Sequence, residues 1–253
     1  RVRGARRDRA ARAALVLVST AVTLLVLELG CHRFGVASDN LAFTLASQRW
    51  FEQHWKPLNQ LGLRDPEIDP AAMERTRRLV VLGDSCAAGQ GVEDAARRAS
   101  GVLRARLEPV WSVVTLAAPG WDTPRETRAL QDFSWAPDVV VLWWYLNDIE
   151  GAAAGHGVRI APDLRVRPPL LAALVERSHL ANYWYWRLRL RFGEDLIGVF
   201  DRFLAESYGD PAIWARYEKE LDALITVVHE RRARLLVVVS PELSNVAGTA
   251  PSA

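Results

Sequence analysis

The chain has 253 residues, half of them hydrophobic, which is enough for one sizeable α/β domain with additional segments. Six arginines and Asp8 give residues 1–12 a charge of +5, so the net charge of +2 leaves −3 for the remainder. Because the basic excess is confined to one end, we expect no nucleic-acid partner. Two cysteines are too few for a disulfide framework, and no spacing of His, Cys, Asp or Glu indicates a metal or cofactor site.

An apolar run from Ala13 to Leu27 follows the basic residues and leads into Glu28. Arginines before such a run are typical of an exported chain whose N-terminus stays in the cytoplasm. We therefore expect a basic cytoplasmic segment at 1–12, a transmembrane or signal anchor at 13–30, and the rest in the periplasm or outside the cell. The run is short for a span of about 20 residues, so a cleaved signal peptide is an alternative, but we favour an uncleaved anchor.

Residues 31–77 are polar, contain several prolines and predict an irregular juxtamembrane lead-in, with an ordered turn at 59–65. From residue 78 onward, apolar runs alternate with helical patterns. The expected strands are 79–82, 111–116, 138–144 and 235–239, and the expected helices are 94–107, 124–133 and one that begins at Asp210-Pro211. This alternation predicts a three-layer αβα domain with a parallel sheet over 78–253.

An insertion at 150–209 has little sheet character. In its middle, hydrophobic residues alternate with arginines as in a strand, but Leu180, Trp184, Leu188 and Phe192 also fit one helical face. We favour a helix capped by Ser178. The arginines are expected in solvent, with lipid headgroups or an anionic substrate as the alternative.

Small polar or glycine residues follow three of the strands, namely Ser85, Gly120 and Asn147. Sites in open parallel sheets lie beyond the carboxyl ends of the strands. We expect a helix to begin directly after Ser85, so that its hydroxyl lies at a helix N-terminus, although Ser or Asp there can also act only as a cap. The pattern favours acyl transfer, with Ser85 as nucleophile and the Ser85 N–H, the Gly120 N–H and the Asn147 amide as oxyanion donors.

These residues resemble the sequence blocks of the SGNH or GDSL hydrolases. Gly83-Asp84-Ser85 is similar to the first block, the glycine in 117–123 to the second, and Asn147-Asp148 to the third. Residues 59–64 resemble the lead-in of membrane-anchored bacterial members. The resemblance implies a flavodoxin-like sheet, Ser85 as nucleophile and Gly120 and Asn147 as oxyanion donors, and we place Asp84 and Asp148 in support.

Two positions near the expected site have other features. Tyr145 stands where the family often has glycine, and its larger side chain would reshape the pocket. Trp121 follows Gly120, and it fits equally well as a residue that stacks on a sugar or acyl chain and as one that packs over the sheet edge.

The family's base and its orienting acid come from an Asp-x-x-His block after the last strand. None of the five histidines has Asp three residues before it, and the nearest imitation ends at His179, inside the insertion. We therefore expect that the sequence, which begins with Arg, is a fragment truncated at its C-terminal end. Without that histidine, Ser85 would be a weak nucleophile.

The sequence thus predicts an extracytoplasmic serine ester hydrolase that acts on a small acyl or acetyl ester, including one on a glycan. An O-acyltransferase with the same site differs only in the acceptor of the acyl group. A noncatalytic glycan-binding or envelope scaffold module on a membrane anchor is the alternative of another class. The expected partners are the substrate and, through the N-terminal helix, the membrane.

Overall fold

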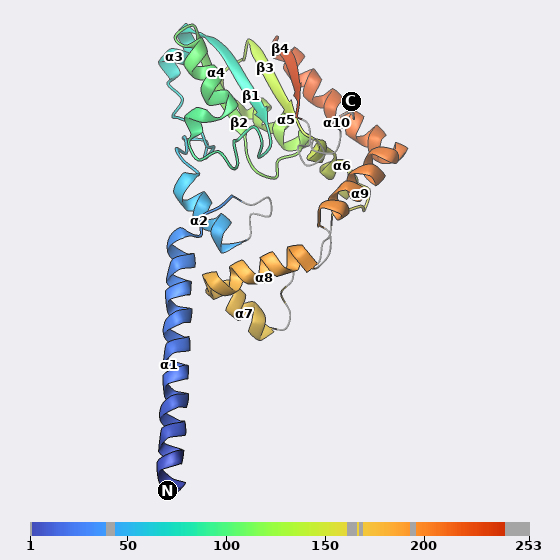
Figure 1. Ribbon diagram of the computed structural model, residues 1–253. Helices are drawn as coiled ribbons and strands as arrows, with labels where there is room; N and C mark the ends of the chain where they lie inside the picture. The colour runs from blue at the N-terminus through green and yellow to red at the C-terminus, as the bar shows by residue number, and fades with distance from the viewer. Residues whose placement is uncertain (1, 39–43, 161–165, 167–168, 193–195, 241–253) are drawn as a thin grey trace, which may run out of the picture. The chain divides into compact units, whose positions relative to one another are not determined.

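The computed structural model describes residues 2–38, 44–160, 166, 169–192 and 196–240 (Figure 1). The chain divides into two compact units. One combines Arg1–Glu52 with Asp163–Glu194, and the other combines Gln53–Pro162 with Asp195–Ala253. A part of the insertion thus groups with the N-terminal segment.

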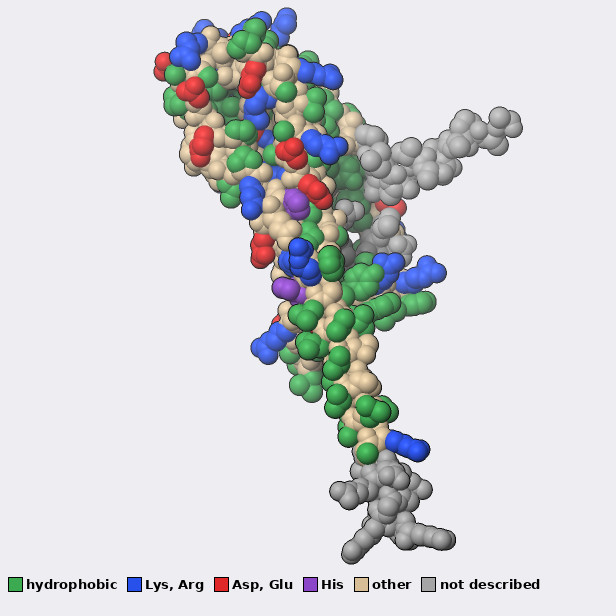
Figure 2. All heavy atoms as spheres, turned by 60° about the vertical axis from the view of Figure 1, so that its left-hand side comes forward, with side chains coloured by type: hydrophobic (Ala, Val, Ile, Leu, Met, Phe, Trp, Pro, Cys, Tyr) green, Lys and Arg blue, Asp and Glu red, His purple; other side chains and the backbone are tan. Residues whose placement is uncertain are grey.

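The first unit is helical and contains α1 (Val2–Phe34), α2 (Leu45–His54), α7 (Pro169–Arg177) and α8 (His179–Phe192). The part of α1 from Ala11 to Phe34 is long and apolar enough to cross a membrane, and none of it is buried in the protein. Figure 2 shows hydrophobic side chains along this part of the helix. The expected N-terminal helix is therefore present, and it extends to Phe34.

The helix favoured in the middle of the insertion is confirmed as α8. The Ser178 hydroxyl accepts a 3.1 Å hydrogen bond from the backbone N–H of Ala181, as expected of its cap. The buried side chains of α8 are Asn182 and Trp186, whereas Trp184 and Leu188 are exposed. The face that the sequence pattern singled out is therefore the outer one.

The second unit is built on four strands, β1 (Arg77–Gly83), β2 (Trp111–Ala117), β3 (Val139–Trp144) and β4 (Arg234–Val239). All neighbours are parallel, in the order β2-β1-β3-β4. The expected α/β fold with a parallel sheet is confirmed. The chain crosses from β1 to β2 on one side and later to β3 on the other, so the topological switch point lies between β1 and β3.

Helices pack on both faces of this sheet (Figure 1). Val80 and Leu82 of β1 belong to a core with α5 (Thr123–Asp132) and α10 (Pro211–Glu230), whereas Leu79 and Val81 face α4 (Ala99–Leu107). Successive strand residues point to opposite faces, so a continuous apolar run is buried on both sides. The remaining helical segments are α3 (Pro70–Arg75), η1 (Ala95–Arg97), η2 (Leu146–Ile149), α6 (Glu150–Gly155) and α9 (Leu196–Gly209).

Two details of the sequence interpretation differ from the structure. The lead-in, expected to be irregular, contains α2 and α3, and α3 begins where Asp69 accepts a hydrogen bond from the Ala71 N–H. The helix expected over 94–107 is split into η1 and α4, because Arg98 between them is extended and its side chain is buried. Within the described residues, β4 forms an edge of the sheet, and Leu236, Val237 and Val239 are more than half exposed.

Candidate active site

The register of the sheet brings three strand ends to one edge. Gly83, the last residue of β1, pairs with Ala117 of β2 on one side and with Trp143 of β3 on the other. Ser85, Gly120 and Asn147 follow the last residues of β1, β2 and β3 by two or three residues. The edge that carries the switch point therefore also carries the three residues that the sequence predicted for the site.

The chain turns sharply after β1. A Cβ atom on Gly83 would lie 2.7 Å from the Ala87 Cβ and 3.0 Å from the Trp143 carbonyl oxygen, so a larger residue does not fit there. Residues 85–91 form turns, in which the Gln90 N–H donates to the Ser85 carbonyl oxygen at 2.9 Å. Gly89 and Gly91 have φ of +75° and +89°, which a right-handed helix does not contain.

The prediction of a helix directly after Ser85 is therefore wrong. The next helical residues after the turns are those of η1, which begins at Ala95. Ser85 consequently gains no stabilisation from the positive end of a helix dipole, and its surroundings are set by the loop and by Asp84.

Asp84 supports the loop that follows β1 and carries Ser85, which we call the candidate nucleophile loop. Its carboxylate is fully buried, and one oxygen accepts a 2.8 Å hydrogen bond from the Cys86 N–H. The Ser85 hydroxyl, half-buried, donates to the other oxygen over a long 3.4 Å. Asp84 thus fixes the backbone directly after Ser85 while holding the hydroxyl only weakly.

Cys86 is a second potential nucleophile beside Ser85. Desolvation of its thiol, together with the charge of Asp84, raises the pKa of Cys86 to about 11. A thiol with this pKa remains protonated near neutral pH and is a poor nucleophile. Ser85 is therefore the better candidate of the two.

Gly120 lies on an exposed turn after β2. Its φ is +72°, and among the described residues, its two chain neighbours apart, no atom lies within 4 Å of where a Cβ would be. Arg125 donates a 3.0 Å hydrogen bond to the Gly120 carbonyl oxygen, and Asp122 caps α5 by accepting from the Arg125 N–H at 3.2 Å. The turn is thus fixed by α5, and its outer side is open for the close approach of another molecule.

Asn147 and Asp148 belong to η2, directly after β3. Asp148 is fully buried and accepts a 3.2 Å hydrogen bond from the Tyr145 N–H, which closes the turn. The side-chain oxygen of Asn147 is buried and has no hydrogen-bond partner among the described residues. An unpaired buried amide oxygen is unusual, and it occurs at the edge where a substrate would bind.

A cluster of carboxyl groups lies behind these residues. Burial raises the pKa of Asp148 to about 8, and the charges of Asp84, Asp122 and Glu150 contribute to this shift. Burial raises the pKa of Glu126 well above its usual range, and Asp148 and Asp84 raise it further. Asp148 is therefore largely neutral near neutral pH, and the pKa of Glu126 is shifted in the same direction.

Glu126 was missed by the sequence interpretation. It is fully buried on α5, and neither of its carboxyl oxygens has a hydrogen-bond partner among the described residues. A glutamate in a polar helical stretch carries no sequence signal of burial, so only the fold could reveal it. Within the described part of the chain, no group of three or more His, Cys, Asp and Glu side chains could hold a metal ion.

The lead-in turn is tied to the candidate nucleophile loop by a buried arginine. The Asn59 side chain closes the turn by accepting from the backbone N–H groups of Leu61 and Leu63, as the sequence predicted. Arg64, at the end of this turn, is only 1% exposed. Its guanidinium donates to the carbonyl oxygens of Gly89 at 2.6 Å, Val92 at 2.6 Å and Glu93 at 3.0 Å.

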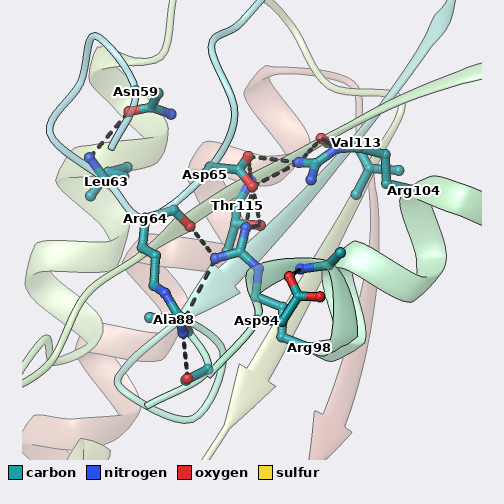
Figure 3. A network of polar contacts seen from close by, with 12 residues as sticks. Asn59, Leu63, Arg64, Asp65, Ala88, Asp94, Arg98, Arg104, Val113 and Thr115 are labelled. Carbon is teal, nitrogen blue, oxygen red and sulfur yellow. Dashed lines mark hydrogen bonds and ion pairs between the residues drawn. The ribbon is translucent and has the colours of Figure 1, made fainter. Parts of the chain in front are cut away.

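The next residue, Asp65, joins the same network (Figure 3). Arg98 donates to the Asp65 carboxylate and to the Arg64 carbonyl oxygen, and Arg104 donates to both Asp65 oxygens at 2.7 and 2.8 Å. The Thr115 N–H of β2 also donates to Asp65 at 3.0 Å. The buried aspartate is thus fully paired, and the network connects the lead-in, α4, β2 and the loop after Ser85.

The histidines do not complete a catalytic pair. Among the described residues, the Ser85 hydroxyl hydrogen-bonds to Asp84 and to no histidine. His179 lies instead against His32 in the first unit, with ring nitrogens 2.9 Å apart. His229 is exposed near the C-terminal end of α10, and His156 ends α6. Trp121 is half-buried and packs against the core between the sheet, α5 and α10.

Comparisons with known proteins gave matches among solved structures. No protein-family model matches the chain, and no curated protein matches it. Among solved structures, the SGNH-hydrolase family esterase AlinE4 is 14% identical over 70% of this chain and 81% of its own, with a TM-score of 0.28. TesA is 18% identical over 61% of this chain and 99% of its own, with a TM-score of 0.27.

Proposed function

We propose that the chain is a membrane-attached serine ester hydrolase, with Ser85 as nucleophile and Gly120 and Asn147 as oxyanion donors. The observation that carries this proposal is the register of β1, β2 and β3, which aligns the three strand ends on the switch-point edge. Acyl transfer needs a nucleophile and hydrogen-bond donors for the oxyanion. Three different strand ends supply one such residue each.

In the proposed reaction, the Ser85 oxygen attacks the ester carbonyl carbon and loses its proton to a base. The carbonyl oxygen becomes an oxyanion that accepts hydrogen bonds from the Ser85 and Gly120 N–H groups and the Asn147 amide. Collapse releases the alcohol, which takes up the proton, and water then hydrolyses the acyl-serine. The base is not assigned to any of the described residues.

The neutral state of the buried carboxyl groups supports this chemistry. Two ionised carboxylates behind the site would oppose the negative charge that forms in the tetrahedral intermediate. Burial keeps Asp148 largely protonated near neutral pH and raises the pKa of Glu126, so this opposition is reduced. Asp84 and Asp148 act in the proposal by positioning the loops that carry Ser85 and Asn147.

The proposed substrate is a small acyl or acetyl ester, including one on a glycan. The turn at Gly120 is open, so such a substrate can approach its backbone N–H closely. Trp121 is proposed to border this substrate with the exposed part of its ring. The basic residues before the apolar part of α1 support a site outside the cytoplasm. Acyl transfer to a sugar hydroxyl is the variant of this proposal in which the acceptor is not water.

One observation favours a second, noncatalytic function. Among the described residues, no histidine hydrogen-bonds to the Ser85 hydroxyl, and a serine without a base is a weak nucleophile. In this alternative, the open edge at Gly120 and Asn147 binds an acylated glycan without cleaving it. The two functions differ in whether Ser85 is activated.

Labelling with a fluorophosphonate tests this difference without knowledge of the substrate. The full chain in detergent is labelled beside Ser85→Ala and beside Ser134→Ala, which removes an exposed serine elsewhere. The hydrolase proposal expects labelling of the parent and of Ser134→Ala but not of Ser85→Ala. A folded chain that is not labelled, or labelling that persists in Ser85→Ala, would contradict Ser85 as an activated nucleophile in these 253 residues.

A further inference from the structure

Glu28, at the end of the apolar run, connects α8 to α1 through hydrogen bonds. Glu28 accepts hydrogen bonds from the Ser178 hydroxyl at 2.6 Å and from the backbone N–H groups of His179 at 2.7 Å and Leu180 at 3.0 Å. These N–H groups are the unpaired donors of the first turn of α8, and the helix dipole favours a negative charge there. Glu28 therefore caps α8 from another helix, which explains an acidic residue in a membrane-compatible segment.

Further contacts fix the same helical hairpin, which we define as α7 and α8. His179 lies against His32, one turn after Glu28 on α1, with ring nitrogens 2.9 Å apart. Asn182 is buried, accepts a hydrogen bond from the Leu45 N–H of α2 at 3.1 Å and donates to the Val175 carbonyl oxygen of α7 at 3.0 Å. The hairpin is thus held to the C-terminal end of α1 by Glu28 and His32, and to the start of α2 by Asn182.

The attachment point defines the depth of the hairpin relative to a membrane. Residues 13–27 of α1 are free of charge, Glu28 is the first charged residue after them, and His32 and Arg33 follow within two turns. A helix that crosses a membrane changes from apolar to polar residues at the interface. The hairpin is therefore attached at the interface of the leaflet in which α1 ends.

The outer surface of the hairpin has the composition of an interfacial helix. Trp184, Leu188 and Phe192 are 51%, 49% and 78% exposed and recur every four residues, so they form one stripe along α8. Leu170 and Leu174 of α7 are also exposed. Apolar and aromatic residues of this kind are costly to leave in water over such a continuous surface.

Arginines adjoin this stripe. Arg187 and Arg191 are exposed and stand one turn apart on α8, next to the stripe in the helical order. Arg187 lies over the ring of Tyr183, with its guanidinium carbon 5.6 Å from the ring centroid. Long arginine side chains beside apolar ones can reach the headgroup level while their neighbours enter the acyl layer.

We propose that the α7–α8 hairpin lies in the interfacial layer of the membrane that α1 crosses. Its stripe of Trp184, Leu188 and Phe192 enters the upper acyl layer, and Arg187 and Arg191 bind anionic lipid headgroups. The membrane is favoured over a second copy of the chain or another protein because the hairpin is fastened to the membrane helix at interface depth and combines apolar, aromatic and basic residues. This proposal is independent of whether Ser85 is catalytic.

Spin labelling of the full chain in lipid vesicles tests the depth of the stripe. Cys31→Ser and Cys86→Ser remove the native thiols, and a nitroxide is attached at Leu188→Cys. The matched control is a nitroxide at Leu61→Cys, since Leu61 is a leucine of nearly equal exposure, 51%, in the other unit. Collisions with oxygen, which concentrates in lipid, are compared with collisions with a water-soluble nickel chelate.

We expect the label at 188 to collide mainly with oxygen and to lie about 5–10 Å below the headgroups, as interfacial helices do. With Arg187→Gln and Arg191→Gln, the label should move outward in vesicles that contain phosphatidylglycerol but hold its depth in phosphatidylcholine alone. Two results would overturn the proposal. One is a label at 188 that meets the nickel chelate as often as the label at 61, and the other is an immobile label shielded from both reagents, which would show that protein covers the stripe.

Discussion

The guanidinium of Arg64 donates a 2.6 Å hydrogen bond to the carbonyl oxygen of Gly89, four residues after Ser85. The same side chain also binds the carbonyl oxygens of Val92 and Glu93, so one charged group holds the C-terminal part of the loop. This loop has no helix to satisfy its backbone carbonyls. The conformation of the candidate nucleophile loop therefore depends on a residue that is more than twenty positions earlier in the chain.

Replacement of Arg64 should destabilise the second unit and loosen the candidate nucleophile loop. Arg64→Ala removes the guanidinium donors to the carbonyl oxygens of Gly89, Val92 and Glu93, and loss of one member of a buried charged network typically costs about 3–5 kcal/mol. Arg64→Lys should cost less but still be destabilising, because a single ammonium cannot reproduce the planar set of donors. Denaturant unfolding measures both, with Arg106→Ala on the exposed side of α4 as the control, expected within about 0.5 kcal/mol of the parent.

Equal stability of Arg64→Ala and Arg106→Ala would contradict this role. Hydrogen exchange distinguishes a local effect from a global one, because a loosened loop should exchange faster at Gly89, Gln90 and Val92 than at the strand residues. Arg64→Lys, which keeps the charge, should show this local change even if the unit remains folded.

The pH dependence of stability should report the buried carboxyl groups. The pKa of Asp148 is raised from its ordinary 3.8 to about 8, so in this range the folded chain holds a proton that the unfolded chain has lost. The favourable contribution is then fully present below about pH 4 and is lost as the pH rises through about 8. The free energy of unfolding should fall by roughly a few kcal/mol between these limits, since one pKa unit corresponds to about 1.4 kcal/mol.

Asp148→Asn should remove the contribution of this residue, because an amide has the shape of the protonated acid and does not ionise. The pKa of Glu126 is shifted in the same direction, so the decline that Glu126 causes should remain. Unfolding of the parent and of Asp148→Asn at several pH values measures the difference. An unchanged pH profile in the variant would mean that Asp148 is already ionised in the folded protein.

The sheet was predictable because its signals are local. Apolar runs such as 139–144 are long enough to be buried on both faces, and the observed strand limits lie within a residue or two of those expected. The strand ends identified Ser85, Gly120 and Asn147 by position, because the carboxyl ends of parallel strands meet at one edge. A helix rather than a strand in the middle of the insertion was also predictable, from the cap at Ser178 and the four-residue spacing of the hydrophobic residues that follow it.

What could not be predicted depends on contacts between distant residues. Residues 86–90 favour a helix by composition, but Gly89 and Gly91 adopt positive φ and the Arg64 guanidinium binds the carbonyls that a helix would use. Arg98 interrupts the expected helix because Asp65, distant in sequence, binds its side chain. Likewise, the role of Glu28 depends on α8, whose first backbone N–H groups donate hydrogen bonds to its carboxylate.

The attachment of α8 to α1 should depend on the Glu28 carboxylate. Glu28→Ala removes three acceptor contacts and the negative charge at the helix N-terminus, which together typically contribute about 1–2 kcal/mol. We expect the amides of His179 and Leu180 to exchange several-fold faster with solvent deuterium. Glu52→Ala, an exposed acidic residue of α2, should leave these amides unchanged, and equal exchange in both variants would contradict the capping role.

Asn147 provides the sharpest test of the oxyanion assignment. Its side-chain oxygen is buried without a partner among the described residues, and the NH2 group of the same amide is the proposed donor to the oxyanion. Removal of one oxyanion donor typically lowers the rate about 10²–10³-fold. If the parent is labelled by a fluorophosphonate, Asn147→Ala should be labelled slower by about this factor, and Asn147→Asp should be no better, because a carboxylate would repel the oxyanion. A structural role alone would lower the thermal stability of both variants while leaving the labelling rate of the folded fraction at the parent value, and that result would exclude Asn147 from the oxyanion hole.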